Sequence, residues 1–199
     1  LEIKKGEFFA IQGPSGSGKS TAMHVIGALD APDKGSVYIR SKNVGTLSED
    51  ELAEMRGKTV GFVFQQFNLV PTLTAMENIM LPMIFQGTPE MERERKATEL
   101  LKEVELLDRK DHRPNQLSGG QQQRVAIARA LANDPEMILA DEPTGNLDSS
   151  TGRKIFELLK KLHGKGKTVV VITHDDRIAA EAETVAYIKD GAIIKVKKN

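Results

Sequence analysis

Short apolar runs alternate along this chain with longer amphipathic stretches. The apolar runs predict strands over residues 1–3, 7–11, 36–40, 59–64, 137–140, 168–172, 185–188 and 192–196. Apolar residues three or four positions apart, together with capping residues, predict helices over residues 21–29, 49–56, 90–107, 119–132, 150–163 and 177–183. The alternation predicts an α/β fold, with a mostly parallel sheet flanked by helices on both faces. The last two strands flank Asp190-Gly191 and add a small antiparallel portion.

One long stretch interrupts this alternation. Residues 67–116 read as mostly helical and are punctuated by four prolines, and their clearest helix has an apolar stripe opposite a charged, solvated face. We therefore expect one domain over residues 1–199, in which residues 67–116 form an inserted helical subdomain. Residues 1–66 and 117–199 would form its core.

Composition narrows the classes of function. The 199 residues carry 28 basic and 28 acidic side chains, and this balance argues against a general nucleic-acid binder. The absence of cysteine excludes disulfides, thiolate zinc sites and cysteine nucleophiles. No apolar run approaches the ~20 residues of a spanning helix, so we expect any work at a membrane to go through a partner.

The first chemical signal follows the strand predicted at residues 7–11. The stretch Gly13-Pro14-Ser15-Gly16-Ser17-Gly18-Lys19-Ser20-Thr21 fits the phosphate-loop pattern G-x-x-x-x-G-K-[ST]. Its glycines let backbone N–H groups turn toward a phosphate, and the following helix adds its positive dipole end. Lys19 would reach the outer phosphates and Ser20 would offer a hydroxyl to Mg²⁺. The alternative is a glycine-rich turn with a chance lysine.

Two acids end the strand predicted at residues 137–140. Strands of a parallel sheet end at the edge from which the phosphate loop also leaves, so Asp141 and Glu142 should lie near a bound phosphate. Asp141 would hold Mg²⁺ through its water shell, and Glu142 would orient or deprotonate the attacking water. Taken alone, the pair reads equally well as two ordinary acids that begin a loop.

A second helix start has an unusual sequence, Leu117-Ser118-Gly119-Gly120-Gln121. Ser118 and Gln121 match a capping box, which is a purely structural reading. Capping does not explain the glycines, since each costs ~1 kcal/mol relative to alanine in a helix. Glycines are useful where a ligand approaches the backbone closely, so we expect a second anion-binding helix start here.

These motifs, in this order, resemble those of the ABC ATPases over essentially the whole chain. Residues 117–121 look like the family's signature motif. Gln65 resembles the Q-loop glutamine, Asn146-Leu147-Asp148 the D-loop and His174 the switch histidine. Residues 61–69, 121–126 and 143–148 are similar to the MacB/LolD group, the ATPase subunits of lipoprotein-releasing, macrolide and peptide export systems.

The resemblance implies an ATP- and Mg²⁺-dependent hydrolase that works as a head-to-tail homodimer. Lys19, Gln65, Glu142 and His174 would be catalytic, and Ser20, Gln65 and Asp141 would serve the metal. The second copy would present to the nucleotide the residues Ser118, Gly119, Gly120, Gln121 and Asp148. Two anion-binding helix starts can face one triphosphate from opposite sides only if two molecules cooperate.

The implied partner is an integral-membrane permease, which would place the protein in the cytoplasm, peripheral on the inner face of the cell membrane. Residues 69–83 are a candidate docking surface, and core packing of those side chains is an equally good reading. An FtsE-like ATPase coupled to a different membrane partner is the main alternative. A DNA-repair ATPase is disfavoured by the short span between Gln65 and Ser118, and a module that binds ATP without hydrolysing it stays open.

One departure from the family concerns the start of the chain. The family's adenine-stacking aromatic residue precedes the first strand, whereas this sequence begins at Leu1 without an initiator methionine. Tyr38 and Tyr187 do not occupy the corresponding position. Either a preceding segment supplies the aromatic residue or adenine is held weakly. We also expect residues 1–11 to lie at an open sheet edge.

Overall fold

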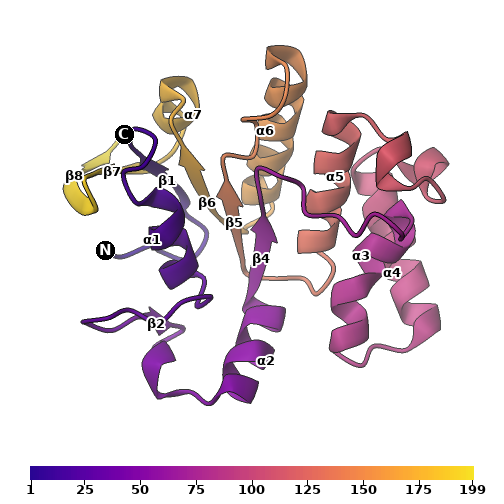
Figure 1. Cartoon of the computed structure of the whole chain (residues 1–199), viewed down its shortest axis with the longest axis horizontal. Coiled ribbons are helices and arrows are strands. Elements are labelled where there is room, and N and C mark those ends of the chain that lie inside the picture. Colours follow the sequence, from indigo (N-terminus) through magenta and orange to yellow (C-terminus); the bar gives the residue numbers. More distant parts are fainter.

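A six-stranded sheet forms the centre of the computed structural model, which describes residues 1–199 (Figure 1). The strand order is β4 (Val60–Val63), β5 (Met137–Asp141), β6 (Thr168–Thr173), β1 (Phe8–Gln12), β7 (Thr184–Lys189) and β8 (Ala192–Lys198). Neighbouring strands from β4 to β7 are parallel, and only β8 runs antiparallel, to β7. The predicted fold class and the hairpin about Asp190-Gly191 are confirmed.

Strands β4, β5, β6, β1 and β7 are buried along most of their length, whereas every residue of β8 is exposed. Alternate residues of the buried strands point to opposite faces of the sheet. Phe8 and Ala10 of β1 join the larger core, which includes apolar residues of α5 (Gly119–Ala130), α6 (Ser149–Gly164) and α7 (Asp176–Ala180). Phe9 and Ile11 join a smaller core with Met23 of α1 (Lys19–Ile26). Helices therefore cover both faces, as the sequence pattern predicts.

A small antiparallel unit and one helix lie between α1 and β4. The unit pairs β2 (Tyr38–Ile39) with β3 (Lys42–Asn43), and a short 3-10 helix follows at Val44–Thr46. The helix α2 (Glu49–Thr59) begins at Ser48, whose hydroxyl accepts from the Glu51 N–H while the Glu51 carboxylate accepts from the Ser48 N–H. The predicted capping box is confirmed.

The remaining helices lie beyond β4, at the opposite end of the molecule from β8 (Figure 1). They are α3 (Ala75–Phe85), α4 (Glu90–Glu103) and 3-10 turns at Leu107–Arg109 and Pro114–Gln116. Ile79 and Met83 of α3 belong to the same core as the sheet, and Leu69, Met76 and Met80 pack against it. This favours the core reading for most apolar side chains of residues 69–83. No helix has both the length and the apolar character that crossing a bilayer requires.

Two expectations about the N-terminal part are wrong. Residues 1–3 form no strand, and a turn in which the Glu7 N–H donates to the Lys4 carbonyl precedes β1. Strand β1 lies between β6 and β7 rather than at an open edge.

The predicted helix over residues 21–29 also ends earlier, at Ile26, and Leu29 is 42% exposed instead of lying on the apolar face. A Cβ on Gly27 would lie 2.6 Å from the Phe62 ring, and Ala28 has φ +56°. The helix therefore gives way to a turn at Gly27 and Ala28, where the chain packs against Phe62 of the sheet. Likewise α4 ends before Glu105, which has φ +58°.

Candidate functional site

The loop between β1 and α1 is built on left-handed glycines. Gly16 has φ +76° and Gly18, at the start of α1, has φ +92°, which are conformations that glycine adopts without strain. The Ser17 N–H donates to the Pro14 carbonyl, and the Gly191 N–H from the β7–β8 turn donates to the Ser17 carbonyl. A Cβ on Gly13 would lie 2.2 Å from the Ile188 carbonyl oxygen. The loop is thus supported from below by β7 and its turn.

Four segments enclose a hollow of about 690 Å³ above this loop, at the carboxyl ends of the strands. None of its lining residues is hydrophobic, and they are Pro14, Ser15, Gly16, Gly18, Lys19, Ser20, Thr21, Gln65, Asp141, Glu142 and His174. All the predicted cis site residues therefore meet here except Gly13 and Ser17, which support the loop. A wide polar hollow beside a helix N-terminus suits a phosphorylated ligand.

Lys19 supplies the positive charge in this hollow. Its side chain is only 6% exposed, and its Nζ donates to the Pro14 carbonyl at 2.8 Å. The same Nζ lies 3.9 Å from Glu142 Oε1. A largely desolvated ammonium with one neutral hydrogen-bond partner retains donors for an anion.

Ser20 and Asp141 form an oxygen-rich pair beside Lys19. The Ser20 hydroxyl donates to Asp141 Oδ2 at 2.9 Å, while Asp141 Oδ1 is buried without a hydrogen-bond partner. Burial raises the pKa of Asp141, the Ser20 hydrogen bond opposes that rise, and the charge of Glu142 adds to it. A buried carboxylate oxygen without a partner, next to a hydroxyl, suits a hard divalent cation such as Mg²⁺.

Glu142 lies between Lys19 and His174, and its backbone is strained. Its φ of +42° is unusual for a residue with a side chain, and such conformations cost of order 1–3 kcal/mol. The Glu142 N–H donates to the Ile172 carbonyl at 2.9 Å, and Glu142 Oε2 lies 2.8 Å from His174 Nδ1. The turn aims a carboxylate into the hollow, where it can accept a proton from a water molecule.

Gln65 enters the hollow from the end of β4. Its Nε2 donates to Asn146 Oδ1 at 3.4 Å, and Asn146 Nδ2 donates back to the Gln65 carbonyl at 2.9 Å. The Q-loop and D-loop residues of the sequence prediction are therefore joined directly.

The predicted second anion site lies outside this hollow. Ser118 and Gln121 form the expected capping box. A Cβ on Gly120 would lie 2.3 Å from Thr151 Cγ2 of α6, so close helix packing is one reason for this glycine that the sequence did not reveal. Asp148 caps α6 by accepting from the Ser150 and Thr151 N–H groups. Hydrogen bonds from the Thr151 and Ser150 hydroxyls, together with these N–H groups, hold the pKa of Asp148 well below its usual range. Residues 118–121 and Asp148 do not reach the hollow of their own chain.

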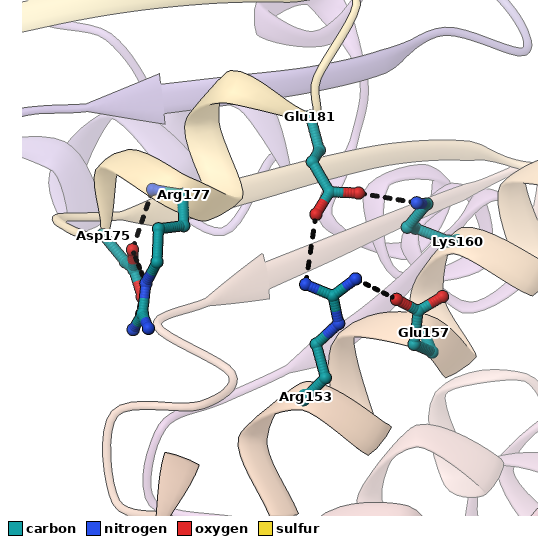
Figure 2. Close-up of polar contacts among 6 residues, drawn as sticks. All are labelled: Arg153, Glu157, Lys160, Asp175, Arg177 and Glu181. Atoms are coloured by element: carbon teal, nitrogen blue, oxygen red, sulfur yellow. Dashed lines mark hydrogen bonds and ion pairs between the residues drawn. The ribbon is translucent and has the colours of Figure 1, made fainter. Parts of the chain in front are cut away.

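Ion pairs hold the short helix α7, which follows His174, against α6 (Figure 2). Glu181 Oε2 lies 2.6 Å from Lys160 Nζ, and Glu181 Oε1 lies 3.5 Å from Arg153 Nη1. Arg177 pairs with Asp175, the residue after His174, at 2.8 Å. Exposed pairs contribute at most about 1 kcal/mol each, so they orient α7 more than they stabilise it.

One buried polar residue near the site escaped the sequence analysis. Gln123 is fully buried on α5, and its Nε2 donates to the carbonyl of Pro143, the residue after Glu142. The sequence feature that could have identified Gln123 is its position on the buried stripe of α5, between Gly120 and Ile127.

Comparisons with known proteins agree with this geometry. Residues 1–145 match the family model described as ABC transporter. An uncharacterized ABC transporter ATP-binding protein of Thermotoga maritima is 56% identical over 198 residues, covering 100% of this chain and 85% of the relative. The macrolide export ATP-binding/permease protein MacB of Brucella melitensis is 54% identical over 98% of this chain, which corresponds to 30% of MacB.

A solved structure shares the whole fold. The ATP-binding cassette MJ0796, whose sequence is from Methanocaldococcus jannaschii, has been solved as a dimer in a post-hydrolysis state bound to ADP and Pi. It superposes with a TM-score of 0.91 at 56% identity, covering 100% of this chain and 88% of that one. Both the family prediction and its MacB-like group are confirmed. The chain therefore belongs to the ABC transporter family, among its ATP-binding subunits.

Proposed function

We propose that this chain binds and hydrolyses ATP, and that it drives a membrane permease by closing and opening as a dimer. The observation that carries the proposal is the meeting of Lys19, Asp141, Glu142 and His174 in one polar hollow over a phosphate loop. The related cassette bound to ADP and Pi supports nucleotide hydrolysis.

Binding of ATP would use the backbone of residues 13–18, the start of α1 and the side chains of Lys19, Ser20 and Thr21. The N–H groups and the ammonium would neutralise the phosphates. Ser20, Gln65 and Asp141 would hold Mg²⁺, which supplies charge neutralisation of the phosphate oxygens when bound.

Hydrolysis would use Glu142 as the base. The carboxylate accepts a proton from water while the water oxygen forms a bond to the γ-phosphorus, and the bond to the bridging oxygen of ADP breaks. His174, 2.8 Å from Glu142 Oε2, would orient that carboxylate and contact the γ-phosphate. Gln65 would position the water, and Lys19 would stabilise charge on the phosphoryl group.

A second copy would complete the site. Residues 118–121 and Asp148 do not line the hollow of their own chain, and the dimeric state of the related cassette supports their use in trans. ATP would then be clamped between two copies, and loss of the γ-phosphate would release them. Closure and opening would shift a partner between two states through differential affinity.

The partner would be an integral-membrane permease, and MacB supports this because it is an ATP-binding/permease protein. Such a partner would place the chain at the cytoplasmic face of the cell membrane. The permease would set the transported substrate and the direction of transport.

Steady-state ATPase measurement with Mg²⁺ tests the proposal. We expect turnover by the purified chain and its loss in Glu142→Gln, with nucleotide binding retained. A wild-type chain that binds ATP without turnover, or a Glu142→Gln variant with normal turnover, would refute it. Capture of a permease by the tagged chain tests the partner, and capture of a cell-division protein instead would favour the FtsE-like reading.

A further inference from the structure

A single buried amide joins the signature helix to both loops of the catalytic site. Gln123 lies in the second turn of α5 and is 0% exposed. Its Nε2 donates to the Pro143 carbonyl at 2.8 Å and lies 3.4 Å from the Phe64 carbonyl. Pro143 directly follows Glu142, and Phe64 directly precedes Gln65.

The turn after β5 needs such support, because Glu142 has φ +42°. Two hydrogen bonds hold it from the sheet and from within the loop. The Glu142 N–H donates to the Ile172 carbonyl, and the Gly145 N–H donates to the Glu142 carbonyl, both at 2.9 Å. Gln123 adds a third bond, which comes from α5.

The segment around Gln65 is held in a similar way by side chains. Asn146 donates to the Gln65 carbonyl, and the Arg129 guanidinium donates to the carbonyls of Phe67 and Asn68. Arg129 and Gln123 both belong to α5. The helix that begins at Ser118 thus contacts both the Gln65 segment and the Glu142 turn through polar side chains.

We propose that Gln123 is a positioning residue that couples α5 to the catalytic carboxylate of Glu142 and to Gln65. When residues 118–121 engage a nucleotide on the second copy, the shift of α5 is transmitted through this amide to the turn that aims Glu142. The coupling rests on the proposed ATP hydrolysis.

The polarity of Gln123 supports this role. It occupies a stripe otherwise formed by apolar and small residues, and its Oε1 has no hydrogen-bond partner. A buried amide with an unpaired oxygen is unfavourable compared with an apolar side chain of similar size. Gln123 is therefore better explained by a role in orienting the turn at Glu142 than by a contribution to the stability of the fold.

The test compares substitutions of two side-chain amides that donate to backbone carbonyls, one on α5 and one in the turn that follows it. Gln123→Met keeps length and removes the donor. The matched control is Asn133→Leu, because Asn133 Nδ2 donates to the Gly57 and Pro82 carbonyls, which do not line the hollow. We expect Gln123→Met to lower kcat at least tenfold with the KM for ATP within twofold of wild type. Asn133→Leu should leave kcat within twofold.

A second readout is independent of turnover. Hydrogen exchange of the Glu142 N–H should be faster in Gln123→Met and unchanged in Asn133→Leu. If methionine prevents folding, Gln123→Leu also lacks the donor and carries no charge, and it should give the same two effects.

Three results would overturn the proposal: a Gln123 variant with kcat within twofold of wild type, equal losses in the Asn133 control, or unchanged exchange of the Glu142 N–H. A wild-type chain without turnover would instead refute the proposed function, and the exchange measurement would still decide whether Gln123 holds the turn.

Discussion

Substitution of Gly120 by alanine separates the two reasons for a glycine at the start of α5. The added Cβ would lie 2.3 Å from Thr151 Cγ2, so α5 and α6 must move apart or Thr151 must rotate. Overpacking of this kind costs ~1–3 kcal/mol, and the gain in helix propensity offsets ~1 kcal/mol. We expect Gly120→Ala to lower the free energy of unfolding by about 0–2 kcal/mol, from these two magnitudes.

Thr151→Ser removes the methyl group that would clash and keeps the hydroxyl. Because Thr151 is half-buried, the single substitution should cost at most about 0.8 kcal/mol, the value of one fully buried methyl group. Combined with Gly120→Ala, it should restore stability, so that urea unfolding gives a coupling energy of ~1–3 kcal/mol between the two sites. Effects that add within ~0.5 kcal/mol would refute the packing explanation.

The same double variant tests the proposed contact with nucleotide. A Cβ on Gly120 would point toward Thr151 of its own chain, so an effect on ATP-dependent dimerisation that persists after stability is restored would come from crowding of the Gly120 N–H rather than from helix packing. We expect the Gly120→Ala/Thr151→Ser protein to dimerise poorly with ATP although it is folded. Dimerisation equal to that of wild type would mean that Gly120 serves helix packing alone.

Three further predictions concern the loop lysine, the metal carboxylate and a helix cap. Lys19→Ala should weaken ATP binding ~10–100-fold, since charge-assisted hydrogen bonds contribute ~1.5–3 kcal/mol. The control is Lys160→Ala, which loses a surface ion pair and a cation–π contact with Phe156, both outside the hollow. Unchanged affinity for the Lys19 variant would contradict the loop assignment. Because burial raises the pKa of Asp141, its ionisation costs stability as pH rises through the ordinary aspartate range. Asp141→Asn should therefore raise the Tm of the nucleotide-free protein at neutral pH, with the gain vanishing in acid, while Mg²⁺-dependent turnover is lost; a pH-independent Tm difference would contradict this. Ser48→Ala should lower the unfolding free energy by ~1 kcal/mol through loss of the α2 cap, with the KM for ATP unchanged, and chemical denaturation measures it.

Features encoded by local rules were predictable from the sequence. The phosphate loop, the acids at the end of β5 and the capping residue Ser48 depend on residues close together in the chain, and the structure shows the predicted geometry for each. Parallel topology then brings Gln65, Glu142 and His174 to one edge of the sheet, as the order of strands and motifs implied.

Features that depend on contacts between distant segments were not predictable. α1 ends where Gly27 lies against Phe62 of β4, and a Cβ on Gly120 would clash with Thr151 of α6. The role of Gln123 could not be predicted, because its partners are carbonyls 59 and 20 residues away in the chain. In each case the contact joins two different elements. The periodicity of a single helix does not predict such contacts.

The most direct test of the account is the oligomeric state of the Glu142→Gln protein with and without ATP. Light scattering coupled to gel filtration should show a monomer without nucleotide and a stable dimer with ATP, which reverts when ADP replaces ATP. A protein that remains monomeric with saturating ATP, although it binds the nucleotide as tightly as wild type, would contradict the claim that two copies clamp one triphosphate.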